Sequence, residues 1–256
     1  MDINLINILT SFICLIFGYL CGSFSFSIII GKVFYHQDPR KFGSKNAGGT
    51  NAGRLWGKKA GLAVILLDMI KTIAPMWIAW AILTYIPFGD KPLMASTLTY
   101  YTEANKDYII QWPVYVLVSL GCFIGHCWPL FDHFKGGKGV TVFCGMLVGS
   151  SWLFGIVPAL SIYFPILRRT KYVSLTSIII GLISVVATWV WVILVLCKVI
   201  PNGYEWLPMF GPTINCTWHF ALVLTINVGI MIAKHHTNIS RLVKGEERKI
   251  TWLKDY

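Results

Sequence analysis

The stretch VSLTSIIIGLISVVATWVWVILVLC, from Val173 to Cys197, carries no charged residue. A membrane-spanning helix needs about 20 consecutive, mostly apolar residues, so this stretch predicts one. Four more segments qualify or come close: Leu5 to Ile30, Gly61 to Phe88, Gln111 to Leu130 and Trp218 to Ala233. A sixth, Val140 to Leu167, is apolar but is interrupted by Gly155, Pro158 and Pro165. This pattern predicts an all-α integral membrane protein.

The composition points the same way. Of the 256 residues, 55% are hydrophobic and 13% are charged, and the mean hydropathy is +0.64. An ordinary soluble domain is about 25% charged, and a chain of this size could not bury so many apolar side chains in its own core. A soluble globular protein and a disordered one are therefore both excluded. The seven cysteines include no Cys-x-x-Cys pair, so we expect neither a zinc site nor a disulfide framework.

The basic residues are gathered in four clusters between the apolar segments. The chain has 22 Lys and Arg against 11 Asp and Glu, and 18 of the basic residues lie in these clusters. Cytoplasmic loops of membrane proteins carry an excess of Lys and Arg, so all four clusters are expected in the cytoplasm. In a soluble protein this surplus would suggest nucleic acid; here we expect no nucleic-acid partner. The clusters run from Lys32 to Lys59, Lys135 to Lys138, Arg168 to Lys171 and Lys234 to Lys254.

The broken segment decides the topology. If Val140 to Leu167 crossed the membrane once, the nine basic residues of the last two clusters would lie outside. If it enters and returns as two short helices, every cluster stays inside, and irregular backbone is tolerated where protein or water surrounds it. We place the turn near Gly155 and Pro158. The sequence thus predicts one domain, residues 1–256, with about seven transmembrane helices, two of them a short re-entrant pair. Its N-terminus is expected outside and its C-terminus in the cytoplasm.

The first basic loop has the composition of a phosphate site. It reads GSKNAGGTNAGR from Gly43 to Arg54, with four glycines and no carboxylate. Glycines let backbone N–H groups approach an anion closely, and arginine binds phosphate in a planar, bidentate way. A flexible linker is the alternative, but it leaves the interleaved Asn, Thr and Arg unexplained. The candidate ligands here are Ser44, Asn46, Gly48, Thr50, Asn51 and Arg54.

The second basic loop contains the sequence FKGGKG, from Phe134 to Gly139. Lys135 and Lys138 bracket two glycines, and a helix is expected to begin at Val140. Backbone amides, a positive helix end and two ammonium groups would then converge on one anion. The spacing is not that of a Walker A loop. The alternative is a basic turn attracted to anionic lipids.

Two further pairs of polar residues lie at the end of an apolar segment or inside one. His235 and Asn238 are three residues apart and share a helix face, so His235 could bind a phosphate or move a proton. The alternative is an ordinary polar cap on a membrane helix. Asp68 and Lys71 lie three apart inside the second apolar segment, where charges are functional candidates. We favour a structural pair there over a catalytic one.

Several reaction types lack their signature in this sequence. There is no Gly-x-Ser-x-Gly elbow, no clustered carboxylate pair for magnesium, and no His followed five positions later by Asp. A reaction with a good leaving group, which needs positioning more than a protein nucleophile, fits best.

Three ordered motifs resemble those of the bacterial acyl-phosphate:glycerol-3-phosphate acyltransferase family, over essentially the whole chain. The family's first motif is close to GSGNxGATNxxR, and it is matched at Gly43, Ser44, Asn46, Gly48, Thr50, Asn51 and Arg54. The second, GHxxPxF followed by FKGGKG, is matched at Gly125, His126, Pro129, Phe131 and all of Phe134 to Gly139. The last, RHRENIxRLxxG, is matched at His235, Asn238, Ile239, Arg241, Leu242 and Gly245. A YVSLxS stretch is matched at Tyr172, Val173, Ser174, Leu175 and Ser177. The departures are Lys45, Gly49, Lys234, His236 and Thr237.

The resemblance implies transfer of a fatty acyl group from acyl phosphate to the 1-hydroxyl of sn-glycerol 3-phosphate. The products are 1-acylglycerol 3-phosphate (lysophosphatidate) and phosphate, in the first acylation step of phospholipid synthesis. We also expect a monomer in the bacterial cytoplasmic membrane, with its active site on the cytoplasmic side, and the resemblance implies no metal or organic cofactor. Catalytic roles are expected for His235, Asn238, Lys135 and Arg54. The expected substrate-binding residues are Ser44, Asn46, Gly48, Thr50, Asn51, Arg54, Lys135, Gly136, Gly137, Lys138, Gly139, Ser174, His235 and Asn238.

Two other classes of protein compete with this interpretation. A transporter or binding protein for a phosphorylated solute would suit basic loops and a broken segment, but it predicts inverted repeats that the sequence does not show. A structural protein that recruits anionic lipid leaves the Asn, Thr and Gly pattern unexplained.

Overall fold

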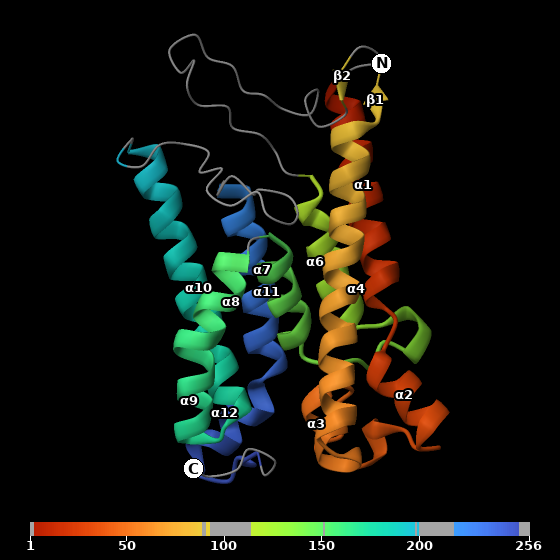
Figure 1. The fold of residues 1–256 in the computed structure, drawn as a ribbon, viewed down its shortest axis with the longest axis vertical. Coiled ribbons are helices and arrows are strands. Elements are labelled where there is room, and N and C mark those ends of the chain that lie inside the picture. The colour runs from red at the N-terminus through yellow and green to blue at the C-terminus, as the bar shows by residue number, and fades with distance from the viewer. Residues whose placement is uncertain are drawn as a thin grey trace.

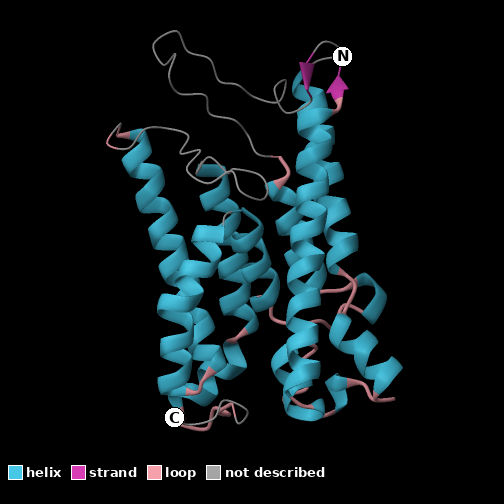
Figure 2. Cartoon of the chain, in the orientation of Figure 1, coloured by secondary structure: helices cyan, strands magenta, loops and turns pink. Residues whose placement is uncertain are grey.

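The computed structural model of the chain describes residues 3–88, 91–92, 114–150, 152–197, 199 and 218–250. In these ranges it is a bundle of helices whose longer members stand side by side (Figures 1 and 2). Two strands of two residues each, β1 (Pro87–Phe88) and β2 (Lys91–Pro92), pair antiparallel at one end. The predicted helical class is therefore confirmed for the described part of the chain.

The first half of the bundle is formed by α1 (Ile3–Gly22), α2 (Phe26–Phe34), the 3-10 turn η1 (Pro39–Lys41), α3 (Gly49–Trp56), α4 (Lys58–Tyr85), α6 (Val116–Cys127) and the 3-10 turn η3 (Leu130–Asp132). The second half is formed by α7 (Val140–Ser150), α8 (Trp152–Pro158), the π-helical η4 (Ala159–Tyr163), α9 (Phe164–Thr170), α10 (Val173–Leu196), α11 (Trp218–Lys234) and α12 (His236–Val243).

Three stretches of described helix are long and apolar enough to cross a membrane: Ile8–Phe34, Lys58–Leu83 and Val173–Leu194. The pair α11 and α12, bent by 58°, would be a fourth, and α6 and α7 are shorter apolar helices. The outer faces carry exposed aliphatic side chains, such as Ile16 on α1, Leu66 on α4 and Val186 on α10. An integral membrane protein is expected to present such a surface to lipid. The count of seven transmembrane helices stays a prediction.

The broken segment does form two short antiparallel pieces, but the predicted turn is wrong. The chain reverses between Ser150 and Trp152, and α7 packs against α8 (Figure 1). Gly155 and Pro158 lie within helix instead, and Gly155 packs so closely on Val148 of α7 that a Cβ there would overlap it. The prolines are tolerated because a π-helical turn follows Pro158 and Pro165 falls in the first turn of α9.

The first apolar segment, expected as one helix from Leu5 to Ile30, forms one candidate span, but its helix is interrupted after Gly22. α1 ends at Gly22, and the Ser23 hydroxyl donates to the Tyr19 carbonyl (2.8 Å) and accepts from the Leu130 amide (3.2 Å). The Phe24 carbonyl, which the break leaves without a helical partner, accepts from the Lys71 ammonium at 2.8 Å. The break therefore lies inside the candidate span Ile8–Phe34, and α2 leads from it to the first basic loop.

α1 and α6 are in closer contact than ordinary side chains allow. A Cβ on Gly18 or Gly22 would overlap a backbone carbonyl of α6, and one on Gly121 or Gly125 would overlap a carbonyl of α1. These are two small-xxx-small pairs facing each other, the arrangement that lets membrane helices approach backbone to backbone. The contact fixes the end of α6, from which the second basic loop departs.

The described parts of the four basic clusters meet at one end of the bundle. The Arg54 guanidinium donates to the Arg248 carbonyl (3.2 Å), Lys138 contacts Asn238, and the Ile250 amide donates to the Lys171 carbonyl (2.9 Å). These bonds link the first cluster to the fourth, the second to the fourth and the third to the fourth. The two loops expected on the other side, Gly89 to Ile110 and Lys198 to Thr217, fall almost wholly outside the described residues.

Candidate active site

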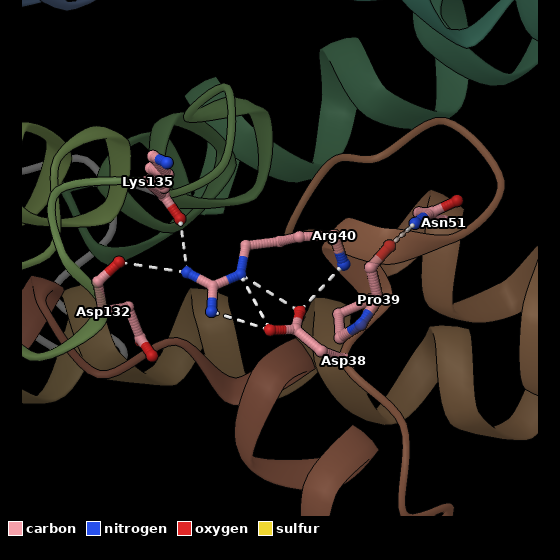
Figure 3. A network of polar contacts seen from close by, with 6 residues as sticks. All are labelled: Asp38, Pro39, Arg40, Asn51, Asp132 and Lys135. Atoms are coloured by element: carbon pink, nitrogen blue, oxygen red, sulfur yellow. Dashed lines mark hydrogen bonds and ion pairs between the residues drawn. The ribbon is translucent and has the colours of Figure 1, made fainter.

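The first basic loop is organised around one buried amide. Asn51, at the start of α3, is 1% exposed, and its Nδ2 donates to the carbonyls of Pro39 (2.9 Å), Asn46 (3.1 Å) and Phe42 (3.2 Å). Its Oδ1 accepts from the Ser44 amide at 2.9 Å. The side chain that the sequence suggests as a phosphate ligand thus folds the loop and holds Ser44 and Asn46 in place. Figure 3 shows its bond to the Pro39 carbonyl.

Arg40 fastens this loop to the second one. Its Nε and Nη2 bind the Asp38 carboxylate, while Nη1 donates to the carbonyls of Asp132 (3.0 Å) and Lys135 (3.3 Å), as Figure 3 shows. The hydrogen bonds from Arg40 hold the pKa of Asp38 below its usual value. The guanidinium therefore acts as a planar bridge between two loops that are about ninety residues apart in sequence.

The two glycines of the second loop are required by close packing. The Gly137 amide donates to the His126 carbonyl at 3.0 Å, and a Cβ on Gly136 or Gly137 would overlap atoms of His126. Gly139 has φ +82°, a conformation that favours glycine, and its Cα lies against the Phe123 ring. Its carbonyl accepts from the Phe143 amide at 2.8 Å, so α7 begins at once and its N-terminus points at the loop.

A carboxylate near the C-terminal end lies among the polar groups of the site. The side chain of Glu247 is 6% exposed, and it accepts from Ser174 (2.8 Å), Asn238 (2.6 Å) and Arg241 (2.7 Å). Burial opposes its ionisation, but these hydrogen bonds outweigh burial and hold the pKa of Glu247 below its usual value. The Asn238 amide is shared, because its Oδ1 also accepts from Lys138.

Two cations face this carboxylate from the two basic loops. Burial lowers the pKa of Lys138 to about 8, although the charge of Glu247 opposes the shift. Burial also lowers the pKa of Arg54, again against the attraction of Glu247. With Arg241 they form a cluster of three basic side chains around one acid, so the site carries a surplus of positive charge.

His235 stands at the end of α11, beside this cluster. It is 3% exposed, and its Nδ1 lies 2.7 Å from the Met231 carbonyl. A carbonyl only accepts, so Nδ1 carries the proton and Nε2 carries the free lone pair. Burial lowers the pKa of His235 to about 4, which keeps the ring neutral at physiological pH.

Beside these residues a cavity of about 440 Å³ opens between the two loops and the ends of α11 and α12. One part of its wall is apolar, formed by Trp128, Ile230 and Ala233, and the rest is polar and strongly basic. Such a wall suits a molecule with an anionic head and an apolar tail. The polar lining residues are Ser44, Lys45, Asn46, Gly136, Lys138, Lys234, His236, Thr237 and Arg241.

The comparisons with known proteins agree with this geometry. The sequence model of the family described as "Glycerol-3-phosphate acyltransferase" matches residues 12–245. The chain belongs to the glycerol-3-phosphate acyltransferase family. Curated glycerol-3-phosphate acyltransferases from Staphylococcus saprophyticus and Ureaplasma urealyticum are 32% and 33% identical to it. Each alignment covers 94% of this chain, and 98% and 91% of the respective relative.

The acyltransferase also resembles solved structures in fold. PlsY (YgiH), an integral membrane glycerol 3-phosphate acyltransferase, superposes with a TM-score of 0.68 in its glycerol 3-phosphate form at 26% identity. Its lysophosphatidic acid form gives 0.66 at 25% identity. Both comparisons cover 94% of this chain and 96% of PlsY. The chain is accordingly an integral membrane acyltransferase with the PlsY fold.

The structure brings most of the expected site residues of this acyltransferase together, but not all. Ser44, Asn46, Gly136 and Lys138 line the cavity, and Arg54, Ser174, His235 and Asn238 gather near Glu247. Lys135 is exposed and contributes its carbonyl to Arg40, and Asn51 is buried inside the loop. Gly48 and Thr50 begin α3 beside them.

Sequence reasoning missed Glu247, Asp38 and Arg40. Glu246 and Glu247 are the only acids between Trp218 and Ile250, a basic stretch, and that isolation was the available signal for Glu247. For Asp38 and Arg40 the signal was weaker, since an Asp and an Arg two residues apart are common in turns.

Proposed function

We propose that the acyl donor is acyl phosphate, so that the reaction forms 1-acylglycerol 3-phosphate and inorganic phosphate from sn-glycerol 3-phosphate. The observation that carries this proposal is the pair of adjoining anion-binding regions. In one, Ser174, Asn238 and Arg241 donate hydrogen bonds to the Glu247 carboxylate, which supports a role for these donors in binding an oxyanion. The other is the basic cavity with an apolar wall. A reaction between two phosphorylated molecules, one of them lipid-like, needs both.

The residues divide between the two substrates. Ser44, Asn46, Gly48, Thr50 and Arg54 present polar groups to glycerol 3-phosphate, and Asn51 orders the loop that carries them. Lys138 and the amides of Gly136, Gly137 and Gly139 receive the donor phosphate at the N-terminal end of α7. Ser174, His235 and Asn238 close the site from the side of α10 and α12. Lys135, being exposed, adds positive charge at the rim.

The chemistry needs no protein nucleophile. The 1-hydroxyl oxygen attacks the acyl carbon, the bond from that carbon to the phosphate oxygen breaks, and phosphate leaves. Lys138 and the loop amides stabilise the charge that develops on the leaving phosphate, and holding the two reactants together supplies much of the rate. In the described part of the chain neither Ser44 nor Ser174 hydrogen-bonds to a histidine, which agrees with direct transfer.

We assign the proton of the hydroxyl to a phosphate oxygen. A phosphate monoester takes up a proton with a pKa of about 6, whereas burial lowers the pKa of His235 to about 4. The phosphate is therefore the stronger base, and the free Nε2 of His235 accepts a hydrogen bond that orients the hydroxyl. Near-normal turnover in His235→Ala would show that this ring neither takes the proton nor orients the hydroxyl.

The site faces the cytoplasm, where glycerol 3-phosphate is made, and the donor enters from the bilayer. Four basic clusters at this end of the bundle support that orientation. We expect a monomer with its N-terminus outside and its C-terminus in the cytoplasm, crossing a bacterial cytoplasmic membrane.

The test is an assay with the purified chain in lipid vesicles. Palmitoyl phosphate and glycerol 3-phosphate should yield lysophosphatidate and free phosphate in equal amounts, and Lys138→Met should abolish most of the turnover while the exposed-lysine variant Lys58→Met does not. Parallel arms contain palmitoyl-CoA or palmitoyl-acyl carrier protein. If product forms only in one of those arms, acyl phosphate is not the donor. If glycerol 3-phosphate binds but no arm gives product, the chain does not catalyse this acyl transfer.

A further inference from the structure

Asp68 and Lys71 form an ion pair deep inside the bundle. They lie one turn apart on α4, their charged atoms are 2.8 Å apart, and their side chains are 2% and 4% exposed. Burying two charges is costly, and a buried pair is stable only where further polar contacts support it. The contacts of this pair therefore indicate its role.

Three groups with lone pairs surround the Lys71 ammonium. Besides Asp68, they are the Phe24 carbonyl at 2.8 Å and Nδ1 of His126 at 3.0 Å. Because an ammonium only donates, Nδ1 of His126 accepts and the proton of the neutral ring stands on Nε2. Lys71 thus fixes both the orientation and the tautomer of His126.

His126 in turn supports the second basic loop. Its carbonyl accepts from the Gly137 amide at 3.0 Å. A Cβ on Gly137 would overlap Nε2 of the ring and lie 2.8 Å from the Ala47 carbonyl, and a Cβ on Gly136 would overlap the His126 carbonyl. The ring therefore sits directly beneath the two glycines, at the point where the second loop meets the first.

The second carboxylate oxygen of Asp68 supports the C-terminal end of the same loop. Oδ2 of Asp68 accepts from the Thr141 hydroxyl at 3.4 Å, in the first turn of α7. Lys138 lies between Gly137 and Thr141 in sequence. The residue before it contacts His126, which Lys71 binds, and Thr141 after it binds Asp68 directly.

We propose that Asp68 and Lys71 are positioning residues, which act through His126 and Thr141 to hold the Gly136–Lys138 turn in the geometry that receives the donor phosphate. The identity of that donor rests on the proposed function; the positioning does not. The pair and the neutral ring carry no net charge, so they contribute geometry and leave the positive charge of the site to Lys138 and Arg54.

Two double variants separate this role from plain stabilisation. Asp68→Leu with Lys71→Met removes both charges together and leaves neither unpaired. Asp68→Lys with Lys71→Asp keeps a pair but moves the ammonium a turn away from Phe24 and His126. In both, kcat/KM for palmitoyl phosphate should fall by about tenfold or more. Trp189→Phe, which removes a remote bond between α10 and α11 (3.0 Å to Thr225), is the matched control and should keep the parent value.

A second measurement does not depend on activity. Hydrogen exchange of the amides of residues 134–141 should become about tenfold faster in both double variants, with exchange in α10 unchanged. If the parent chain does not use palmitoyl phosphate, the proposed function fails. The hydrogen-exchange measurement still tests whether Asp68 and Lys71 hold the Gly136–Lys138 turn. If the double variants do not fold, the isosteric variant Thr141→Val replaces them. It should also speed exchange of the amides of residues 134–141. Parent-like exchange in a folded variant overturns the proposal.

Discussion

Lys138 is the residue whose chemistry depends most on its surroundings. Burial lowers its pKa to about 8, so the free enzyme loses this charge as the pH rises through that value. Since kcat/KM reports ionisations of the free enzyme, kcat/KM for the donor should fall about tenfold for each pH unit above 8. Lys138→Arg keeps its charge, so the alkaline limb of its pH–rate profile, where kcat/KM falls, should shift to higher pH. The exposed control Lys58→Arg should not, and an unchanged limb in Lys138→Arg would contradict the assignment.

At this scale the sequence predicted residue types better than residue roles. Composition and motif suggested Arg54, Lys138, His235 and Asn238 as site residues, and the structure gathers these four near Glu247. Their partner Glu247 could not be found that way. Its hydrogen bonds come from α10 and α12, and only the folded chain brings Ser174 beside it.

At the scale of elements, the two basic loops behave as one unit because of Arg40. Its fork binds Asp38 and two carbonyls of the second loop at the same time. Arg40→Lys keeps the charge but cannot make these bonds together. Each lost bond to a charged group is worth about 1.5–3 kcal/mol, so we expect kcat/KM to fall by roughly tenfold or more in steady-state kinetics. Arg169→Lys, at an exposed site on α9, is the control, and equal kinetics in the two variants would show that Arg40 does not couple the loops.

The glycine contact between α1 and α6 makes a second prediction at this scale. A Cβ on Gly121 has no room against the Leu15 carbonyl, whereas one on Gly229 of α11 meets nothing within 4 Å. Overpacking costs about 1–3 kcal/mol, so Gly121→Ala should lower the thermal unfolding midpoint in detergent. Gly229→Ala should keep or raise it, because alanine favours helix. A midpoint for Gly121→Ala equal to that of Gly229→Ala would contradict backbone-to-backbone packing.

Helix ends were harder to predict than helices. α10 and α11 match their predicted segments within a residue, since long uncharged runs have no other stable form in a bilayer. The break at Ser23 and the reversal between Ser150 and Trp152 were missed. Each is set by tertiary contacts, the first by the Leu130 amide and the second by the packing of Gly155 on α7.

For the whole molecule, the short helices α7 to α9 decide on which side each basic cluster lies. If they crossed the membrane once, Lys171 would stand on the opposite face from Lys138. In the structure the Lys171 carbonyl accepts from the Ile250 amide, and Lys138 contacts Asn238, which lies twelve residues before Ile250 in the chain. Both clusters are therefore tied to the same C-terminal segment, which a single crossing could not allow.

A shared face for the four basic clusters predicts how introduced cysteines react in intact cells. In a chain whose seven native cysteines are replaced, Lys59→Cys, Lys171→Cys and Lys244→Cys should react with a membrane-impermeant maleimide only after the cells are opened. A cysteine restored at position 197, exposed at the far end of α10, should react before opening. All four sites are on the described surface, so burial does not explain a failure to label. Reaction of position 171 in intact cells would mean that α7 to α9 cross the membrane once, and that the four basic clusters do not share one face of the membrane.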